Sequence, residues 1–137
     1  MRTFFDSSAF AKRYIEEPGS EDVDSLCQKA GEVGLSVLCV PEIISALNRR
    51  VREGLLTRRE YAEAKQYFSE DIRDAVIVNL VGEVVSACTK ILQTNPVRAA
   101  DALHIACALE WEAELFVSAD KTQISAAKRA GLRTRFI

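Results

Sequence analysis

Four acidic side chains could together bind a metal ion, because each follows a predicted strand or opens a predicted helix. They are Asp6, Glu42, Asp101 and Asp120. Carboxylates gathered in one cleft repel each other unless a cation is bound, so we expect a raised pKa for at least one of them without metal. Oxygen ligands alone suit hard divalent ions such as Mg²⁺ or Mn²⁺ rather than zinc. The pattern therefore predicts a magnesium or manganese site.

Each of the four acids also has an ordinary structural explanation. Asp6 and Asp120 stand where they could cap the helix that follows them. Glu42 and Asp101 lie near helix starts, where the helix dipole favours negative charge. No single acid is diagnostic, and the metal hypothesis depends on their common placement.

Three serines and a histidine lie beside these acids in the sequence. Ser7, Ser8 and Ser118 could hold a carboxylate or polarise a water molecule, but none has a histidine base that would make it a nucleophile. His104 follows Asp101 by three residues, which makes the two near neighbours on a helix. A histidine bonded within the fold is the favoured interpretation, ahead of a metal ligand. The GxxxxGK[ST], GxGxxG and GxSxG motifs are absent.

The acids must be positioned by a chain that alternates short apolar runs with helical stretches. The apolar runs predict strands over residues 3–5, 35–40, 75–78 and 115–117, and a half-charged edge strand over 133–137. Amphipathic spacing predicts helices over residues 20–30, 42–52, 57–68, 81–92, 99–112 and 123–130. Ser20 is expected to cap the first of these helices, and Thr57 with Glu60 forms a capping box for the third.

This alternation predicts an α/β fold of three layers. Strands that are apolar on both faces indicate a central, mostly parallel sheet of about five strands, covered by helices on both faces. The first three gaps between strands are long enough for two helices each, and the last fits one. Ligands bind beyond the carboxyl ends of such strands. Asp6, Glu42 and Asp120 fall at these ends, and Asp101 could face the same ligand-binding edge of the sheet.

Length and composition fit one domain over residues 1–137, with 48% hydrophobic residues and a net charge of −2. Such a charge gives no argument for nucleic-acid binding. No uncharged run approaches the roughly 20 residues of a membrane span, and Asp6 after two Phe leaves no room for a signal peptide. The four cysteines lack paired spacing, which predicts buried free thiols and a cytoplasmic protein.

The segments that carry the acids resemble the four motifs of PIN-domain proteins, specifically the VapC-type toxins. The similarity lies in residues 5–14 with 17–20, in residues 41–50, in residues 98–106, and in residues 116–121 with the small residues that follow. All four motifs occur in order and span essentially the whole chain, and it is their combination that is specific. The stretch from about residue 55 to 80 carries no diagnostic residue.

The resemblance implies an Mg²⁺- or Mn²⁺-dependent ribonuclease that acts as the toxin of a toxin–antitoxin pair and forms a homodimer. It carries Asp6, Glu42, Asp101 and Asp120 over as catalytic and metal-binding acids, with Ser8 and Ser118 as supporting hydroxyls. Some relatives have a fifth acid close after the fourth, where Thr122 and Gln123 stand in this chain. That difference argues against a second metal ion.

An RNA substrate would require cations close to the acidic mouth. The basic residues nearest to the acids in sequence are Lys12, Arg13, Arg49 and Lys121. A protein partner would require exposed apolar surface, and seven large side chains are candidates for it. They are Phe10, Tyr14, Leu55, Leu56, Tyr61, Tyr67 and Phe68. The alternative is that the helices around Ser20 and Thr57 bury these side chains against each other.

Two other functions compete with a nuclease. A phosphoryl-transfer enzyme with an aspartyl phosphate, of the haloacid-dehalogenase or receiver type, would need an acid two positions after Asp6 or an aspartate after the third strand. Ser8 occupies the first of these positions, and Asn79 and Leu80 occupy the second. A catalytically silent PIN-like module that binds RNA or forms complexes is the other alternative, and the presence of all four acids argues against it.

Overall fold

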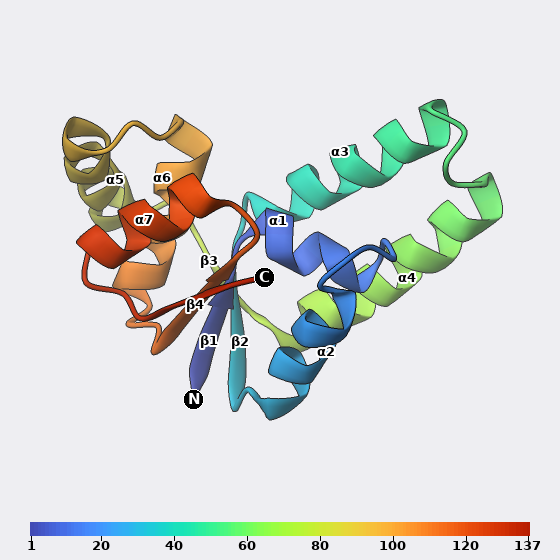
Figure 1. The fold of residues 1–137 in the computed structure, drawn as a ribbon, viewed down its shortest axis with the longest axis horizontal. Helices are drawn as coiled ribbons and strands as arrows, with labels where there is room; N and C mark the ends of the chain where they lie inside the picture. The colour runs from blue at the N-terminus through green and yellow to red at the C-terminus, as the bar shows by residue number, and fades with distance from the viewer.

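The computed structural model describes residues 1–137 and consists of a five-stranded sheet between two layers of helices (Figure 1). The strands are β1 (Arg2–Phe5), β2 (Glu32–Ser36), β3 (Val76–Val78), β4 (Leu115–Ser118) and β5 (Thr134–Phe136). Their order is β3-β2-β1-β4-β5, and every neighbouring pair is parallel. The predicted three-layer α/β fold is confirmed, with β5 at an edge, and the sheet is wholly parallel.

The connections between strands hold the helices in the predicted distribution. The helical segments are α1 (Ser7–Phe10), the 3₁₀ turn η1 (Ala11–Arg13), α2 (Ser20–Lys29), α3 (Cys39–Arg52), α4 (Arg58–Asp74), α5 (Gly82–Thr94), α6 (Ala99–Glu110) and α7 (Lys121–Arg129). The first three connections hold at least two helical segments each, and the last holds α7 alone.

Each face of the sheet has its own hydrophobic core. Phe4 and Phe116 point to one face, where they pack with residues of α5, α6 and α7. Phe5, Leu35 and Val117 point to the other face, where they pack with residues of α1, α3 and α4. Figure 1 shows these two layers on opposite sides of the sheet. Because side chains alternate along a strand, neighbouring residues of β1 and β4 serve different layers.

The strand order places a topological switch point between β1 and β4. From β1 the chain builds β2 and β3 outward on one side, and then returns to add β4 and β5 on the other side. Loops after strands that flank such a point diverge, which opens a crevice at the carboxyl ends of the two strands. Asp6 follows β1 and Ser118 ends β4, so both lie at this crevice.

The second strand and the helix after it begin earlier than predicted. Strand β2 ends at Ser36, and α3 starts at Cys39, so the predicted strand over residues 35–40 is wrong in its second half. Pro41 lies inside the first turn of α3, where a backbone N–H has no helical partner and its loss costs nothing. Glu42 therefore lies on a helix and does not directly follow a strand.

Two other helix boundaries differ from the predictions. Gly19, with φ of 97°, occupies the N-cap of α2, and Ser20 is the first helical residue. Ser20 instead accepts a bond from the Glu17 N–H and donates one to the Ile15 carbonyl. The Thr57–Glu60 capping box is confirmed, but α4 continues to Asp74.

All four cysteines are free thiols, and three of them are buried: Cys39, Cys88 and Cys107. Cys27 is half-buried, in contrast to the prediction that all four are buried. Burial raises the pKa of Cys39 to about 12, so this thiol stays protonated and unreactive. None of the helices combines the length and the apolar character that a membrane span requires.

Candidate active site

Asp6 is the central acid of the site and is only 1% exposed. It follows the last residue of β1 and caps α1, since its Oδ1 accepts the Ala9 N–H at 2.9 Å. The capping interpretation of Asp6 is therefore correct, and it does not compete with a role in the site. The cap fixes the carboxylate at the carboxyl edge of the sheet, beside the switch point.

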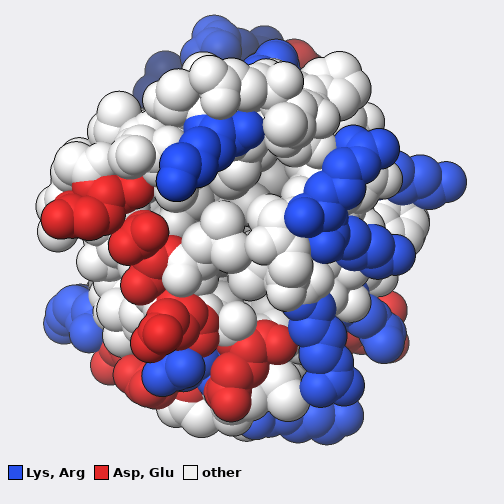
Figure 2. All heavy atoms as spheres, turned by 90° about the vertical axis from the view of Figure 1, so that its left-hand side faces the viewer, with Lys and Arg blue, Asp and Glu red and all other residues white.

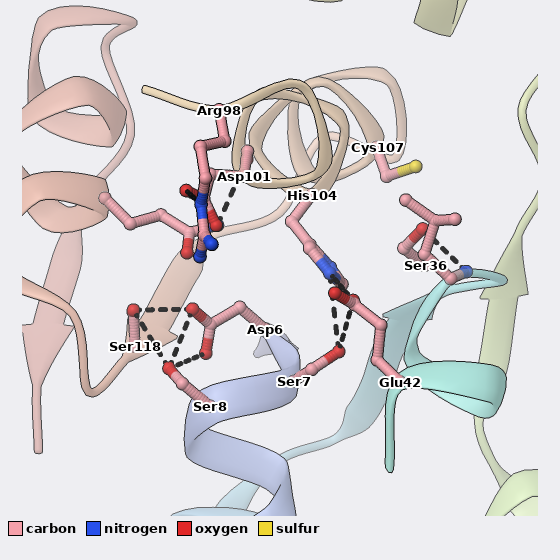
Figure 3. Close-up of polar contacts among 12 residues, drawn as sticks. Asp6, Ser7, Ser8, Ser36, Glu42, Arg98, Asp101, His104, Cys107 and Ser118 are labelled. Carbon is pink, nitrogen blue, oxygen red and sulfur yellow. Dashed lines mark hydrogen bonds and ion pairs between the residues drawn. The ribbon is translucent and has the colours of Figure 1, made fainter. Parts of the chain in front are cut away.

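Two hydroxyl groups hold the Asp6 carboxylate. Ser8 Oγ lies 2.8 and 2.9 Å from the two carboxylate oxygens, and Ser118 Oγ donates to Oδ2 at 2.6 Å. Ser8 Oγ also accepts the Ala119 N–H at 3.1 Å, which ties α1 to the loop after β4. Two of the three serines singled out in the sequence thus lie against Asp6 (Figure 3).

Burial raises the pKa of Asp6 above its ordinary value, while the hydrogen bonds from Ser118, from the Ala9 N–H and from Ser8 oppose the shift. A raised pKa in the acidic cluster was predicted, but the predicted cause was repulsion between carboxylates. The largest cause of the shift is burial, not a neighbouring carboxylate. The shift arises because a charge placed in the interior loses its hydration.

Glu42 lies in the first turn of α3 and is bound by two side chains of other elements. His104 Nε2, on α6, lies 2.6 Å from Glu42 Oε1, and Ser7 Oγ donates to the same oxygen at 2.8 Å. The hydrogen bond from His104 is the main cause that lowers the pKa of Glu42, against partial burial. Glu42 is therefore a carboxylate at neutral pH.

The other two acids have looser surroundings. Asp101 lies in the first turn of α6, 3.5 Å from the Nε of the exposed Arg98. Asp120 caps α7, where its Oδ1 accepts the N–H groups of Thr122 and Gln123. The capping interpretation of Asp120 is thus also correct, and its second oxygen has no protein partner.

The acids do not form a closed set of metal ligands. Figure 3 shows Asp6, Glu42 and Asp101 around one space between α1, α3 and α6. No three His, Cys, Asp or Glu side chains are grouped closely enough to hold one ion. The prediction that the four acids converge on one cleft stays a prediction. Asp6, Glu42 and Asp120 each bind hydrogen-bond donors of their own.

The donor chemistry still fits a hard divalent cation. Mg²⁺ is commonly bound through one or two carboxylates, with water and substrate phosphate as its remaining ligands. Asp6 and Asp101 supply only oxygen atoms. The Ser8 hydroxyl is shared between both oxygens of Asp6, so its rotation frees a lone pair without loss of the Ser118 bond. The site therefore fits a partly hydrated ion rather than a four-carboxylate cage.

A groove of about 620 Å³ leads away from the acids between α1, η1 and α3. Its walls include Ser7, Ser8 and Glu42 at one end and the basic residues Lys12, Arg49 and Arg50 farther along. Lys12 and Arg50 both form ion pairs with Glu17. Arg49 is exposed and has no carboxylate partner, which leaves its charge available to a ligand.

The remaining two cations of the sequence analysis lie elsewhere. Arg13 lies outside the groove walls and is paired with Asp24 and Asp71. These ion pairs engage its guanidinium within the protein. Lys121 follows Asp120 and is exposed, with its Nζ 5.7 Å from the centre of the Phe136 ring.

The two signs of charge are unevenly distributed on the molecular surface. In Figure 2, which faces the α5–α7 side of the molecule, most acidic side chains gather toward the lower left and many basic ones lie on the right, with single basic side chains among the acids and at the top. The chain after Asp120 contains five exposed basic residues and no acid: Lys121, Lys128, Arg129, Arg133 and Arg135. Cations suit the last turn of α7 and the neighbourhood of the edge strand β5, so all of these residues except Lys121 need no ligand to explain them.

Sequence reasoning missed three features of the site. Arg98 was assigned no role, although it lies inside one of the motifs, and Ser7 binds Glu42 rather than the Asp6 carboxylate. His104 is bonded within the fold as expected, but its partner, Glu42 on another element, was not predicted. The three-residue spacing between Asp101 and His104 was the available signal, because it places both on one side of α6.

Comparison with known proteins identifies the family. The family model described as PIN domain matches residues 3–129. The chain belongs to the PIN-domain family. This PIN domain is 31% identical over 106 residues to Ribonuclease VapC45 of Mycobacterium tuberculosis, covering 77% of the chain and 74% of that protein. The family inferred from the four motifs is thereby confirmed.

Solved structures share the fold of this PIN domain. VapC20 of Mycobacterium tuberculosis, described as a sarcin-ricin loop cleaving toxin, superposes with a TM-score of 0.70 at 17% identity over 90% of this chain and 94% of that chain. A toxin–antitoxin complex from Klebsiella pneumoniae gives a TM-score of 0.68 at 11% identity over 90% of each chain. These likenesses support the architecture described above.

The Asp6→Asn variant is expected to raise the melting temperature of the metal-free PIN domain at pH 7. The pKa of Asp6 is higher in the folded than in the unfolded state, so ionisation of this carboxyl destabilises the folded state. This destabilisation is complete at a pH above the folded-state pKa, and it is absent at a pH below the unfolded-state pKa. Asn keeps the acceptor for the Ala9 N–H, and the serine hydroxyls can rotate to accept its amide protons.

Thermal unfolding in chelator at several pH values measures this effect. The gain should shrink as the pH falls through the folded-state pKa of Asp6, because the wild-type carboxyl then becomes neutral. Asp74→Asn, at an exposed position, is the control and should change the melting temperature little. A lower melting temperature for Asp6→Asn at pH 7 would contradict the argument.

Proposed function

We propose that this protein is a divalent-metal-dependent ribonuclease that hydrolyses RNA phosphodiester bonds as the toxin of a toxin–antitoxin pair. The observation that carries the proposal is the placement of Asp6, Glu42 and Asp101 around one space at the switch point of a PIN domain. The ribonuclease relative supports the same reaction. An RNA-cleaving toxin would act in the cytoplasm.

Asp6 and Asp101 are the residues that we propose to hold the cation, as Mg²⁺ or Mn²⁺. The chemistry that a bound divalent ion supplies is activation of water and stabilisation of negative charge on phosphoryl oxygens. Glu42 and Asp120 contribute through water, since each keeps one oxygen without a protein partner. Thr122 and Gln123 give no further carboxylate, which favours one ion over two.

The protein groups around the acids set the geometry of the reaction. Ser8 and Ser118 fix the Asp6 carboxylate from two directions, so it does not reorganise when charge develops nearby. Glu42 lines the groove, and its Oε2, which accepts no hydrogen bond from the protein, can orient an attacking water molecule. The role of this acid would then be general base or water holder.

RNA would follow the groove between η1 and α3. Arg49 is the first candidate to bind a phosphate of the RNA backbone, because it lines this groove and has no ion-pair partner. Lys121 could bind a second phosphate beside Asp120. Lys12 lies in the groove wall but is held by Glu17 and the Pro18 carbonyl, and Arg13 is paired elsewhere, so we give neither a primary role.

RNA cleavage is expected to require a divalent ion and to fall by more than about 100-fold in Asp6→Asn and Asp101→Asn. Residues that only support a metal ligand typically cost about 10- to 100-fold, whereas these two changes remove proposed ligands. The measurement is cleavage of a single-stranded RNA mixture with Mg²⁺, with Mn²⁺ and with excess chelator.

Asp74→Asn serves as the matched control for these charge losses, because Asp74 is an exposed acid at the far end of α4. It should cleave at the wild-type rate. Full cleavage in excess chelator would overturn the metal-dependent mechanism. Binding of RNA without any cleavage would favour the catalytically silent module.

Arg49→Ala is expected to weaken RNA binding to a similar degree for all sequences. The slope of log affinity against log salt concentration should become shallower by about the amount that one phosphate contact contributes. The physical reason is that the Arg49 guanidinium would bind backbone phosphate rather than a base. Arg52→Ala removes an exposed charge from the same helix outside the groove and is the control. Equal salt slopes for the two variants would exclude Arg49 from the RNA path.

A second groove continues from the first and suits a protein partner. It measures about 430 Å³, shares Ile15, Arg50 and Leu55 with the first groove, and extends to Tyr67 on α4. Leu55 is 62% and Tyr67 66% exposed, as expected for a partner surface. The other five candidates for exposed apolar surface are less accessible. Two of them are buried, Phe10 and Phe68, and three are half-buried, Tyr14, Leu56 and Tyr61.

We propose that a segment of the cognate antitoxin lies along these two grooves and blocks the acids. The toxin–antitoxin complex among the solved structures with this fold supports such a partner. An apolar anchor near Tyr67 would leave the rest of the segment free to follow the groove toward Glu42. A second copy of the chain, as in the expected homodimer, is the competing occupant.

Tyr67→Ser is expected to weaken antitoxin binding by at least about tenfold, which corresponds to about 1.4 kcal/mol, and to leave RNA cleavage by the free toxin unchanged. Titration calorimetry with the product of the adjacent reading frame measures the affinity. Val85→Ser, an exposed apolar position on α5 in the other layer, is the control. An unchanged affinity would show that Tyr67 does not contact the antitoxin. Conversion of a dimer to a monomer in light scattering would show that Tyr67 contacts a second copy of the chain instead.

A further inference from the structure

His104 is the only histidine of the chain and is 2% exposed. It lies on α6, one turn after Asp101, and its Nε2 is 2.6 Å from Glu42 Oε1. Glu42 lies on α3, in the opposite helix layer. The bond therefore crosses between the layers over the carboxyl edge of the sheet, next to Asp6 (Figure 3).

The other ring nitrogen of His104 identifies which tautomer makes this bond. Nδ1 is the one buried side-chain nitrogen or oxygen atom of the structure without a hydrogen-bond partner. A neutral imidazole has a single N–H group. A buried N–H without an acceptor would forfeit a strong bond, so the proton is assigned to Nε2, and Nε2–H donates to Glu42.

The donors to Glu42 are arranged unequally on its two oxygens. Nε2–H of His104 and the hydroxyl of Ser7 both donate to Oε1, and these two donors lie 3.3 Å apart. Oε2 receives no hydrogen bond from the protein. Glu42 is half-exposed and lines the groove that leads to the acids, so Oε2 is the oxygen that a water molecule or substrate can reach.

We propose that His104 is a positioning residue that, with Ser7, fixes Oε1 of Glu42 so that Oε2 is presented to the scissile phosphodiester. This inference rests on the proposed ribonuclease activity and adds a residue to it. A glutamate has three rotatable side-chain bonds, and without the imidazole its carboxylate could swing along the open groove. Loss of the bond would then reduce the rate of the chemical step and leave RNA binding intact.

A purely structural role would have a different signature. A core histidine that only filled space would be replaced without catalytic loss by an apolar side chain of similar volume. His104→Leu retains most of the volume and removes the donor. His104→Gln places an amide N–H close to the position of Nε2 and restores the donor. The pair therefore separates packing from hydrogen bonding.

The experiment measures kcat and KM for RNA cleavage by the full chain carrying each substitution. His104→Leu is expected to lower kcat by about 10- to 100-fold, the usual effect of losing a group that orients a ligand, with KM nearly unchanged. His104→Gln should recover most of that loss. Ile105→Val, a buried change on the same helix, should lower the melting temperature without changing kcat.

Nitrogen-15 NMR of the metal-free protein provides a readout that does not depend on activity. With a single histidine, the imidazole signals need no assignment, and they should report a proton on Nε2. Glu42→Gln should shift the Nε2–H signal, while Asp74→Asn should not. A ring that carries its proton on Nδ1 alone, or a ring signal that Glu42→Gln leaves in place, would overturn the inference.

The two hypotheses can fail separately. An inactive wild-type protein with the expected imidazole spectrum would refute the ribonuclease function and leave the His104–Glu42 bond established. An active wild-type protein with an equally active, folded His104→Leu variant would refute the positioning role alone. If His104→Leu does not fold, a His104→Gln variant with the wild-type melting temperature and a 10- to 100-fold lower kcat would also refute it.

Discussion

The hydrogen bond from Ser118 to Asp6 is the contact on which the site depends. It joins the ends of β1 and β4, the two strands that flank the switch point, at 2.6 Å. The same carboxylate caps α1, so the start of the first helix and the end of the fourth strand are set by one side chain. A carboxylate that is buried and bound in this way can be charged only where donors replace its hydration.

The acids of the site therefore differ in character, although they face one space. Asp6 is buried and held by hydroxyl groups, whereas Glu42 is half-exposed and held by an imidazole. Asp101 and His104 share one turn of α6, so movement of that helix would displace both together. The single hydrogen bond between His104 and Glu42 crosses the edge of the sheet and links α6 to α3, which lies in the other layer.

The sheet, the layers and the position of Asp6 could be predicted because they follow from local patterns. An apolar run that ends in an acid marks the carboxyl end of a strand, and Thr57 with Glu60 marks a helix start. The limits of β2 could not be predicted, because the buried Cys39 belongs to a helix yet continues the apolar pattern of the strand. The bond between Glu42 and His104 joins residues 62 positions apart, and no local spacing encodes it. The same holds for the separate hydrogen-bond partners of Asp6 and Glu42 on other elements.

The distribution of the thiols makes the opening of each layer observable. Cys88 and Cys107 lie in the core beneath α5 to α7, and Cys39 lies in the core of the opposite face, near the start of α3. All three are buried, so a thiol reagent can modify each one only after its surroundings have opened. The rate at which the reagent modifies Cys39, compared with its rates at Cys88 and Cys107, reports the local unfolding of one helix layer independently of the other. The native chain thus contains its own probes for which side of the sheet loosens first.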